Sequence, residues 1–439
     1  MNKPVVAIVG RPNVGKSTLF NRIIGARISI VEDEPNVTRD RIYGESEWLG
    51  NPFLVVDTGG IDLAAESELK KKVKGQVELA IEEADVILFV VDGRSGVKSM
   101  DKEIANILRR SNKPVVLAVN KLDNRELAQE VKYNFYELGF GEPYPVSAEH
   151  GMRIGDLLDQ VIDYFERIDD VTYDEDVISI SVIGRPNVGK SSLVNKIIGE
   201  DRVIVGETPG TTRDAVDTYF EVDGNKFVLI DTAGMRRKAK VEAGVERYSV
   251  IRSLRAVDRS EVVLMVLDAT EGITAQDKKI AGYAHEEGKA MVLVVNKWDL
   301  VEKRNNIDQD YADEIRYEAS FLNYAPITFV SALTGQRVME ILEIIEYVAE
   351  QYNRRVETST LNKVVKDATA LVEPPSNKQG KRLRVYYVTQ PRVKPPLFIF
   401  FVNDPELMHF SYKRYLENKI REAFGFEGTP IKILARERS

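Results

Sequence analysis

Short apolar runs alternate with longer amphipathic stretches along most of the chain. The runs are four to seven residues long, are rich in Val, Ile and Leu, and several end in Asp or Asn. Ten of them form two sets of five: Val5–Val9, Phe53–Asp57, Val86–Asp92, Val115–Asn120 and Tyr144–Ser147, then Ile178–Ile183, Phe227–Asp231, Val262–Asp268, Met291–Asn296 and Ile327–Ser331. Continuous apolar strands with helices between them are typical of a mostly parallel sheet covered on both faces. The pattern therefore predicts an α/β fold in which such a sheet is built twice.

The pattern changes beyond Gln351, where strands and helices no longer alternate one by one. The predicted elements there are a helix at Ser359–Glu373, strands at Arg382–Gln390 and Leu397–Val402, a helix at Phe410–Phe424 and a strand at Pro430–Arg436. A polar segment, PPSNKQGK, separates the first helix from the first strand. The order α-β-β-α-β predicts a small α+β domain of a different fold class.

A repeat organises the chain. The octapeptide GRPNVGKS occurs at Gly10–Ser17 and again at Gly184–Ser191, an offset of 174 residues, and the motifs TRD and DT-x-G recur at the same offset. This period is the size of a domain, so we interpret it as a domain duplication. Between the copies, Glu166–Val177 has six acidic residues and one basic residue, as expected of a solvated linker. The predicted domains are residues 1–167, an acidic linker at 168–176, residues 177–351, and a basic domain at 352–439.

Charge is distributed unevenly along the chain. The whole chain has a net charge of −8, whereas the part from Tyr352 onward has 17 Lys and Arg against 9 Asp and Glu. A basic domain on an acidic body predicts an anionic partner. The chain has no cysteine, which excludes disulfides, thiolate metal sites and cysteine nucleophiles. No apolar run is long enough to cross a bilayer and the N-terminus enters a strand at once, so we expect a cytoplasmic protein with no membrane partner.

The repeated octapeptide has the form of a phosphate-binding loop, G-x4-G-K-S, and each copy lies between a predicted strand and a helix. Glycines there let backbone N–H groups turn toward phosphate oxygens at the positive end of the following helix. Lys16 and Lys190 would reach the β- and γ-phosphates, and the hydroxyls of Ser17 and Ser191 would ligate Mg²⁺. The two predicted loops are Gly10, Arg11, Pro12, Asn13, Val14, Gly15, Lys16 and Ser17, and Gly184, Arg185, Pro186, Asn187, Val188, Gly189, Lys190 and Ser191.

Two further pairs of residues complete the predicted magnesium site. Asp57 and Asp231 end strands, in the position of the carboxylate that holds Mg²⁺ through water. Thr38 and Thr212 lie in polar segments between helix and strand, and they fit the switch threonine that closes on Mg²⁺ when the γ-phosphate is present. A helix cap is the alternative role for a threonine before Arg-Asp.

Each of these aspartates begins a DT-x-G motif, whose glycine has the spacing of a backbone amide that detects the γ-phosphate. The motif residues assigned to the nucleotide, with the residue that follows, are Thr58, Gly59, Gly60 and Ile61, and Thr232, Ala233, Gly234 and Met235. Ras-like enzymes place a glutamine where Ile61 and Met235 stand, to orient the attacking water. An apolar side chain cannot orient water, so we expect intrinsic hydrolysis to be slow or to use another aid. The residues assigned to catalysis are Lys16, Thr38, Gly60, Lys190, Thr212 and Gly234.

Base specificity is predicted by Asn120–Asp123 and Asn296–Asp299, each at the end of an apolar strand. The final carboxylate can accept hydrogen bonds from guanine N1–H and the exocyclic amine. Adenine offers neither donor there, and a site built on such bonds rejects an analogue lacking them by about 10⁴-fold, so GTP and GDP are the predicted ligands. The lysine stem would cover the base, and a backbone N–H after the next strand would bind guanine O6. The residues assigned to the base are Asn120, Lys121, Leu122, Asp123, Ser147 and Ala148, and Asn296, Lys297, Trp298, Asp299, Ser331 and Ala332.

With two such domains in tandem and a basic module that ends NDPELMHFSYKRYLENKIREAFGFEGTPIKI, the chain resembles the bacterial Der (EngA) family of GTPases over nearly its whole length. The resemblance implies a KH-like C-terminal domain and a role in assembling the large ribosomal subunit, with ribosomal RNA as partner and no DNA. A tRNA-modification GTPase is an alternative, but such enzymes have one G domain and a C-terminal cysteine. A GTP-regulated RNA-binding scaffold is another, and degraded motifs in one copy would favour it.

Two features of these loops and of the basic domain suggest finer roles. Asn13 and Asn187 resemble the asparagine of potassium-activated GTPases, which implies a K⁺ ion near the bridge between the β- and γ-phosphates; an amide that stabilises the loop is the alternative. Gly425–Gly428 matches the GxxG loop of KH domains, but it lies between a helix and a strand instead of between two helices. We therefore expect a docking turn there rather than an RNA clamp.

Overall fold

The computed structural model describes residues 3–25, 43–57, 75, 77–78, 80–82, 84–124, 131–165, 173–174, 176–200, 202–206, 217–232, 246–302, 304–377 and 380–438, and for 246–251 it describes the backbone alone. Nine of the residues assigned above lie outside these ranges: Thr38, Thr58, Gly59, Gly60, Ile61, Thr212, Ala233, Gly234 and Met235. Most of the acidic linker also lies outside them. The roles given to these residues stay predictions.

The chain divides into two compact units. One comprises residues 1–171 and 242–251, and the other comprises residues 172–241 and 252–439. The first sheet lies in the first unit, and the second sheet shares its unit with the C-terminal domain. The domain boundaries expected from the sequence stay predictions. Within the described ranges, no helix is both long and apolar enough to cross a bilayer.

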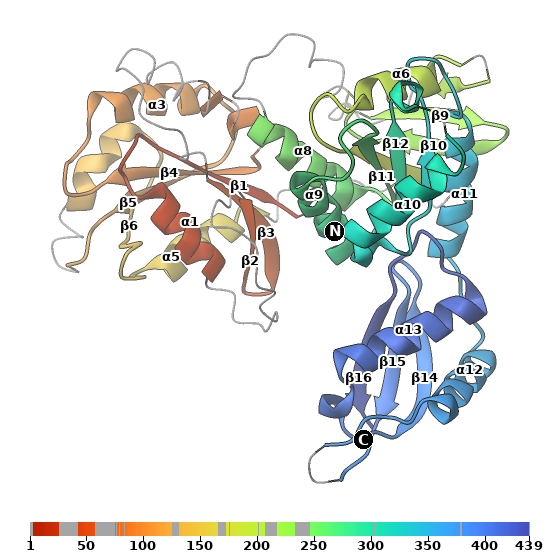
Figure 1. The fold of residues 1–439 in the computed structure, drawn as a ribbon. Helices are drawn as coiled ribbons and strands as arrows, with labels where there is room; N and C mark the ends of the chain where they lie inside the picture. Colours follow the sequence, from red (N-terminus) through yellow and green to blue (C-terminus); the bar gives the residue numbers. More distant parts are fainter. Residues whose placement is uncertain are drawn as a thin grey trace. The chain divides into compact units, whose positions relative to one another are not determined.

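A six-stranded sheet in the order β2-β3-β1-β4-β5-β6 forms the first domain (Figure 1). Its strands are parallel except for β2, which pairs antiparallel with β3. The elements are β1 (Val5–Val9), α1 (Lys16–Gly25), β2 (Tyr43–Trp48), β3 (Asn51–Asp57), β4 (Val86–Asp92), α3 (Ser99–Arg109), β5 (Val115–Asn120), η1 (Lys132–Leu138), β6 (Tyr144–Pro145) and α5 (Ile154–Ile162). The mostly parallel sheet predicted from the apolar runs is confirmed.

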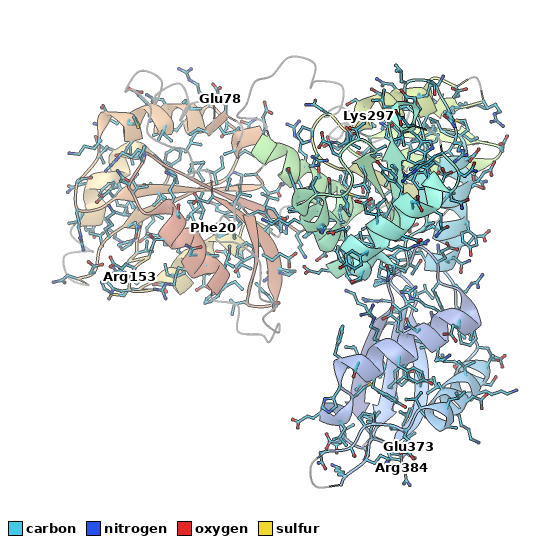
Figure 2. The ribbon with its side chains drawn as sticks, viewed as in Figure 1. Phe20, Glu78, Arg153, Lys297, Glu373 and Arg384 are labelled. Carbon is cyan, nitrogen blue, oxygen red and sulfur yellow. The ribbon has the colours of Figure 1, made fainter. Side chains whose placement is uncertain are left out.

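Alternate residues of β1 pack into two separate cores, one on each face of the sheet. Val6 and Ile8 belong to the core formed with α1 and α5, which includes Phe20, labelled in Figure 2. Ala7 and Val9 belong to the core on the other face, formed with α3 and η1. Because both faces are covered, the strand is apolar throughout and does not alternate with polar residues.

The second domain repeats this plan with a seven-stranded sheet in the order β13-β12-β11-β7-β10-β9-β8. Only the β8–β9 and β9–β10 pairs are antiparallel. Its elements are β7 (Val177–Ile183), α6 (Lys190–Ile198), β8 (Ile204–Gly206), β9 (Thr218–Val222), β10 (Asn225–Leu229), α8 (Glu246–Arg259), β11 (Val262–Asp268), α9 (Ala275–Glu286), β12 (Ala290–Asn296), η4 (Trp298–Leu300), α10 (Ile307–Glu318), η5 (Ser320–Leu322), β13 (Ile327–Phe329) and α11 (Glu340–Tyr352). Leu193 of α6 and Ile341 of α11 pack on one face of this sheet, in a core with Leu264 of β11.

The C-terminal domain has the predicted order α-β-β-α-β. Its elements are α12 (Thr358–Leu371), β14 (Val385–Arg392), β15 (Leu397–Val402), η6 (Pro405–Leu407), α13 (Phe410–Phe424) and β16 (Lys432–Glu437). β15 is the central strand, antiparallel to β14 and parallel to β16. Val365 of α12 and Leu416 of α13 share one core with Phe398 and Phe400 of β15, so both helices cover the same face of the sheet.

The apolar pattern missed three strands, β2, β8 and β9, although it located the central ones. Each missed strand lies at or near the antiparallel edge of its sheet. β2 has the sequence YGESEW and only Ser46 in it is fully buried, and all three residues of β8 are exposed. As edge strands, β2 and β8 pair with one neighbour and bury little side chain, so they produce no continuous apolar run. β9 has two neighbours but buries only alternate residues, Phe220 and Val222, so it produces no continuous run either.

The turn Gly425–Gly428 docks on the second G domain, as predicted. Phe426 is fully buried, and its N–H donates to Gln351 Oε1 of α11 at 3.1 Å. Gly428 bonds through both of its backbone groups: its N–H donates to the Tyr324 carbonyl and its carbonyl accepts from the Met291 N–H, each at 2.7 Å. These bonds occupy the backbone groups that a GxxG clamp would offer to RNA.

Candidate nucleotide-binding sites

The two phosphate loops have matching backbones and each lies against its own base-recognition loop. Gly15 and Gly189 have φ angles of 93° and 98°, in the left-handed region. A Cβ on Gly15 would lie 2.4 Å from Asn120 Nδ2, and a Cβ on Gly189 would lie 2.1 Å from Asn296 Nδ2. Two facts therefore require glycine at this position: the left-handed backbone conformation and the close approach of the asparagine side chain.

The loop lysines lie inside their loops. Lys16 and Lys190 are each 8% exposed. Each Nζ donates to the carbonyls of the first two loop residues, at 2.9 and 3.0 Å in the first copy and at 2.6 and 2.5 Å in the second. Burial lowers the pKa of Lys16, while the nearby charge of Asp57 opposes this and that of Arg11 adds to it. Both amines are placed where a phosphate bound in the loop would meet a positive charge.

Two of the predicted metal ligands of the first domain, Ser17 and Asp57, lie together. Ser17 Oγ, at the start of α1, donates to Asp57 Oδ2, at the end of β3, at 2.5 Å. A hydroxyl and a carboxylate are hard oxygen ligands of the kind that Mg²⁺ takes, together with water and substrate phosphates. The residues present therefore fit the magnesium ion expected from the sequence.

The corresponding aspartate of the second domain has a different backbone. The prediction that its strand extends to Asp231 is wrong, because β10 ends at Leu229 and Asp231 has a φ of 59°. The N–H of Asp231 donates to Asp217 Oδ1 at 3.1 Å, and the hydroxyls of Thr218 and Thr232 are hydrogen-bonded at 2.8 Å. A left-handed residue cannot continue a strand, and aspartate is among the few residues that adopt this conformation readily.

One buried asparagine in each domain joins the base loop to the phosphate loop. Asn120 Nδ2 donates to the Val14 carbonyl at 2.9 Å, and Asn296 Nδ2 donates to the Val188 carbonyl at 2.8 Å. The Oδ1 atoms of the two asparagines accept from the N–H groups of Ala148 and Ala332, at 3.0 and 2.9 Å. The sequence assigned these two amides to guanine O6, whereas here they already donate to asparagine. A contact with O6 would therefore share the N–H between two acceptors.

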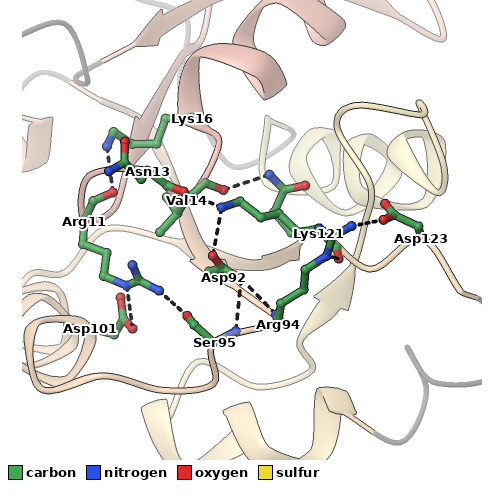
Figure 3. A network of polar contacts seen from close by, with 11 residues as sticks. Arg11, Asn13, Val14, Lys16, Asp92, Arg94, Ser95, Asp101, Lys121 and Asp123 are labelled. Atoms are coloured by element: carbon green, nitrogen blue, oxygen red, sulfur yellow. Dashed lines mark hydrogen bonds and ion pairs between the residues drawn. The ribbon is translucent and has the colours of Figure 1, made fainter.

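The base-loop lysines contact an aspartate to which the sequence gave no role. Lys121 Nζ donates to Asp92 Oδ2 at 2.9 Å and to the Asn13 carbonyl at 2.6 Å (Figure 3). In the second domain, Lys297 Nζ donates to Asp268. Burial alone would raise the pKa of Asp92, but the bonds from Lys121 and from two backbone N–H groups hold that pKa below its usual value. Both aspartates end apolar strands in the two copies, so the repeat itself was a signal that could have identified them.

A second contact in each domain, which the sequence did not predict, joins the arginine at the start of the phosphate loop to a buried aspartate. Arg11 donates to Asp101 Oδ2 at 3.3 Å and to Ser95 Oγ at 2.5 Å (Figure 3). Arg185 donates to Asp277 Oδ2 at 2.9 Å and to Glu271 at 2.7 Å. Asp101 and Asp277 are fully buried, so each arginine provides a buried carboxylate with the partner that it needs.

The carboxylates assigned to guanine have different surroundings in the two domains. Asp123 accepts from Ser147 Oγ at 2.7 Å and from the Arg94 guanidinium (Figure 3). The Ser147 hydrogen bond, together with Arg94, holds the pKa of Asp123 below its usual value. Asp299 is exposed, and within the described part of the chain no side chain bonds to it.

Family models match most of the chain. The model described as 50S ribosome-binding GTPase matches residues 5–121 and again residues 179–297. The model described as the C-terminal KH-domain-like region of EngA bacterial GTPase enzymes matches residues 355–436. The two G-domain matches thus cover most of the two mostly parallel sheets, all but their last strands β6 and β13, and the third match covers nearly all of the α-β-β-α-β domain.

Curated proteins match the chain over its full length. It is 60% identical over 438 residues to GTPase Der of Geobacillus thermodenitrificans, with 100% of both chains covered. It is 58% identical over 439 residues to GTPase Der of Staphylococcus carnosus and 56% identical over 438 residues to GTPase Der of Listeria monocytogenes, again with 100% coverage of both chains.

Proposed function

The chain belongs to the Der family of GTPases, and from this premise we propose that it acts in late assembly of the large ribosomal subunit, in the cytoplasm. The observation that carries the proposal is the family match of both G domains, whose model is described by binding to the 50S ribosome. The KH-like match supports RNA as the surface to which the protein binds.

We propose that each G domain binds GTP and GDP through its phosphate loop and base loop. Lys16 and Lys190 would contact the phosphates, and Asp123 and Asp299 would accept the two guanine donors. The bridges made by Asn120 and Asn296 support this assignment, because they place the two loops side by side before any nucleotide enters. A site fixed in advance loses less free energy to ordering when the ligand binds.

For the metal we propose Mg²⁺ on Ser17 and Asp57 in the first domain, and on Ser191 and Asp231 in the second. Bound Mg²⁺ neutralises charge on the phosphate oxygens during transfer. Thr38 and Thr212 are proposed as the switch ligands, and Gly60 and Gly234 as the γ-phosphate contacts.

We further propose that K⁺ assists hydrolysis beside Asn13 and Asn187. Both side chains are exposed at the phosphate loop, and their φ angles of 64° and 65° turn the loop backbone at that point. Bound K⁺ would supply positive charge near the phosphates. We expect single-turnover hydrolysis to be faster in K⁺ than in Na⁺ at equal ionic strength by at least about tenfold, since an arginine finger contributes about 10³–10⁵ in rate and a weakly held ion less. Equal rates in the two salts, or a rate advantage that survives in the Asn13→Ala/Asn187→Ala variant, would contradict this role.

RNA contact is proposed for the face of the C-terminal sheet opposite its helices. Tyr387 and Phe401 stack there with their ring centroids 4.3 Å apart, and Tyr387 is 39% exposed. Leu434 and Arg436 of β16, next to this pair in the register, are exposed. Aromatic rings on which bases stack, with arginine beside them, are a common surface for single-stranded RNA.

Co-sedimentation with ribosomal subunits tests the proposed function. The full chain loaded with a non-hydrolysable GTP analogue should sediment with large subunits or their precursors. The Lys16→Ala/Lys190→Ala variant, which loses the phosphate contacts, should stay at the top of the gradient. Association that is equal with and without nucleotide would favour the RNA-binding scaffold, and absence of association under all conditions would refute the proposal.

A further inference from the structure

The loops that follow β4 and β11 have different residues at the position beside the site of the base. Arg94 stands two residues after Asp92, and Thr270 stands two residues after Asp268. The backbone N–H groups of both residues bond to their aspartate in the same way, at 2.9 Å. The two loops therefore begin with the same backbone hydrogen bond, and the side chains of Arg94 and Thr270 contact different groups.

In the first domain, the Arg94 side chain joins two parts of the base loop. Its Nε donates to the Lys121 carbonyl at 3.0 Å, and a terminal nitrogen donates to the Asp123 carboxylate (Figure 3). Ser147 Oγ donates to the other carboxylate oxygen at 2.7 Å. Asp123 is thus held from two sides in a single orientation.

In the part of the second domain that the structure describes, no equivalent contact holds the Asp299 carboxylate. Thr270 Oγ1 turns back and donates to Asp268 at 2.7 Å. Ser331, the counterpart of Ser147, accepts from the Thr334 N–H at 3.1 Å. Asp299 is left exposed to solvent, without a side-chain partner among the residues that the structure describes.

The bonds on Asp123 leave room for a base. An ionised carboxylate has about four acceptor positions, two on each oxygen. Arg94 uses one on Oδ2 and Ser147 uses one on Oδ1, so one remains on each oxygen. Guanine brings two donors, N1–H and the exocyclic amine, and these match the two that remain.

We propose that Arg94 is a positioning residue for guanine in the first G domain, holding Asp123 in the orientation that accepts the base. This inference rests on the proposed assignment of Asp123 to guanine. Arg94 itself does not touch the base in this role; it removes the cost of ordering the carboxylate when the nucleotide binds. Because the ion pair is partly exposed, with side-chain exposures of 64% and 32%, its contribution is small, and we expect about threefold to fivefold in affinity.

The test uses the full chain in a Lys190→Ala background, which removes nucleotide binding at the second site. Dissociation constants and dissociation rates are measured for GDP and for IDP, whose hypoxanthine lacks the exocyclic amine. We expect Arg94→Ala to weaken GDP about threefold to fivefold, mainly through faster dissociation, and to weaken IDP less. Arg110→Ala, which removes another exposed arginine of the same domain, should leave both ligands unchanged.

The ratio of GDP to IDP affinity separates positioning from a general structural role. Loss of fold or loss of phosphate contacts would weaken the two ligands equally and would overturn the inference, as would unchanged or tighter GDP binding in Arg94→Ala. Asp123→Asn in the same background tests the underlying assignment separately. If that variant still prefers guanine, Asp123 is not the guanine partner. If it loses the preference while Arg94→Ala has no effect, only the role of Arg94 fails.

Discussion

The two G domains share an octapeptide and a loop geometry, yet their surroundings differ where the sequences were free to diverge. The parts that match are determined by steric fit and hydrogen bonding. Gly15 and Gly189 each lie against an asparagine amide, and the loop lysines bond to carbonyls of their own loops. The parts that differ are the carboxylates. Asp57 ends a strand and bonds to Ser17, whereas Asp231 lies beyond its strand in a left-handed conformation.

This comparison separates the features that both nucleotide sites need from the features that give each site its own binding properties. A phosphate loop tolerates almost no change, since a Cβ at either glycine would meet an asparagine nitrogen at 2.4 Å or less. The environment of the base-binding carboxylate tolerates more, since the first copy has Arg94 beside it and the second has Thr270 at the matching position. The copies are therefore expected to bind the same ligand with different constants.

The largest expected effect comes from the carboxylates themselves. Asp123→Asn and Asp299→Asn should each shift one domain from guanosine toward xanthosine nucleotides, because xanthine has a carbonyl where guanine has its amine. The expected change in preference is about 10⁴-fold. Asp123→Asn also removes the carboxylate charge with which Arg94 is paired, so the first domain should lose more affinity than the second. Nucleotide competition on the full chain measures both, and a variant that keeps its guanine preference would remove that aspartate from the site.

A smaller effect is expected at the docking turn, which belongs only to the second unit. Phe426→Ala should lower the unfolding free energy of that unit by about 3–5 kcal/mol, because a fully buried phenylalanine is deleted. The chain has two tryptophans, and Trp298 lies in the second unit, so the fluorescence of a Trp48→Phe background follows that unit alone. Phe410→Ala, at an exposed position, is the matched control. Equal unfolding of the two variants would show that the turn contributes nothing to stability.

A pH effect should also be confined to the second unit. Burial lowers the pKa of His285 to about 4, with Arg421 and Lys432 adding to the shift, and its Nδ1 lies 3.1 Å from Tyr324 OH. The unfolded chain, with a histidine pKa near 6.5, binds this proton more readily between pH 6.5 and 4, so stability falls as pH falls through that window. We expect a loss of about 2 kcal/mol between pH 7 and pH 5.

Urea unfolding of the chain in the Trp48→Phe background, followed by fluorescence at pH 7 and pH 5, measures this loss. His285→Gln should reduce the difference between them, whereas His409→Gln, at an exposed position, should leave it unchanged. A difference that persists in His285→Gln would assign the pH dependence to another group.

The sequence predicted the central strands and the loops well because these are determined by local pattern. β4 is apolar from Val86 to Val91 since both of its faces are covered, and the lysine of each phosphate loop begins a helix as expected. The contacts across the site could not be predicted in the same way. Lys121 and Asp92 are 29 residues apart and meet only because β4 and β5 pair in register, with Asp92 opposite Asn120.

Arg94 shows more clearly which kind of contact a sequence does not predict. In the sequence it is one arginine in a polar loop, the kind of residue that is usually solvated. Its contact with Asp123 depends on where two separate loops leave the carboxyl edge of the sheet. The edge strands were missed for a different physical reason: β2 and β8 bury so little side chain that no apolar signal marks them.

The number of guanine nucleotides that one chain binds tests the paired sites most directly. Calorimetric titration of nucleotide-free protein with GDP in the presence of Mg²⁺ should give two equivalents per chain, resolved as two affinities. Lys16→Ala should remove one of them and Lys190→Ala the other. A single equivalent in the wild-type chain, abolished by one lysine variant and unaffected by the other, would contradict the existence of two working sites.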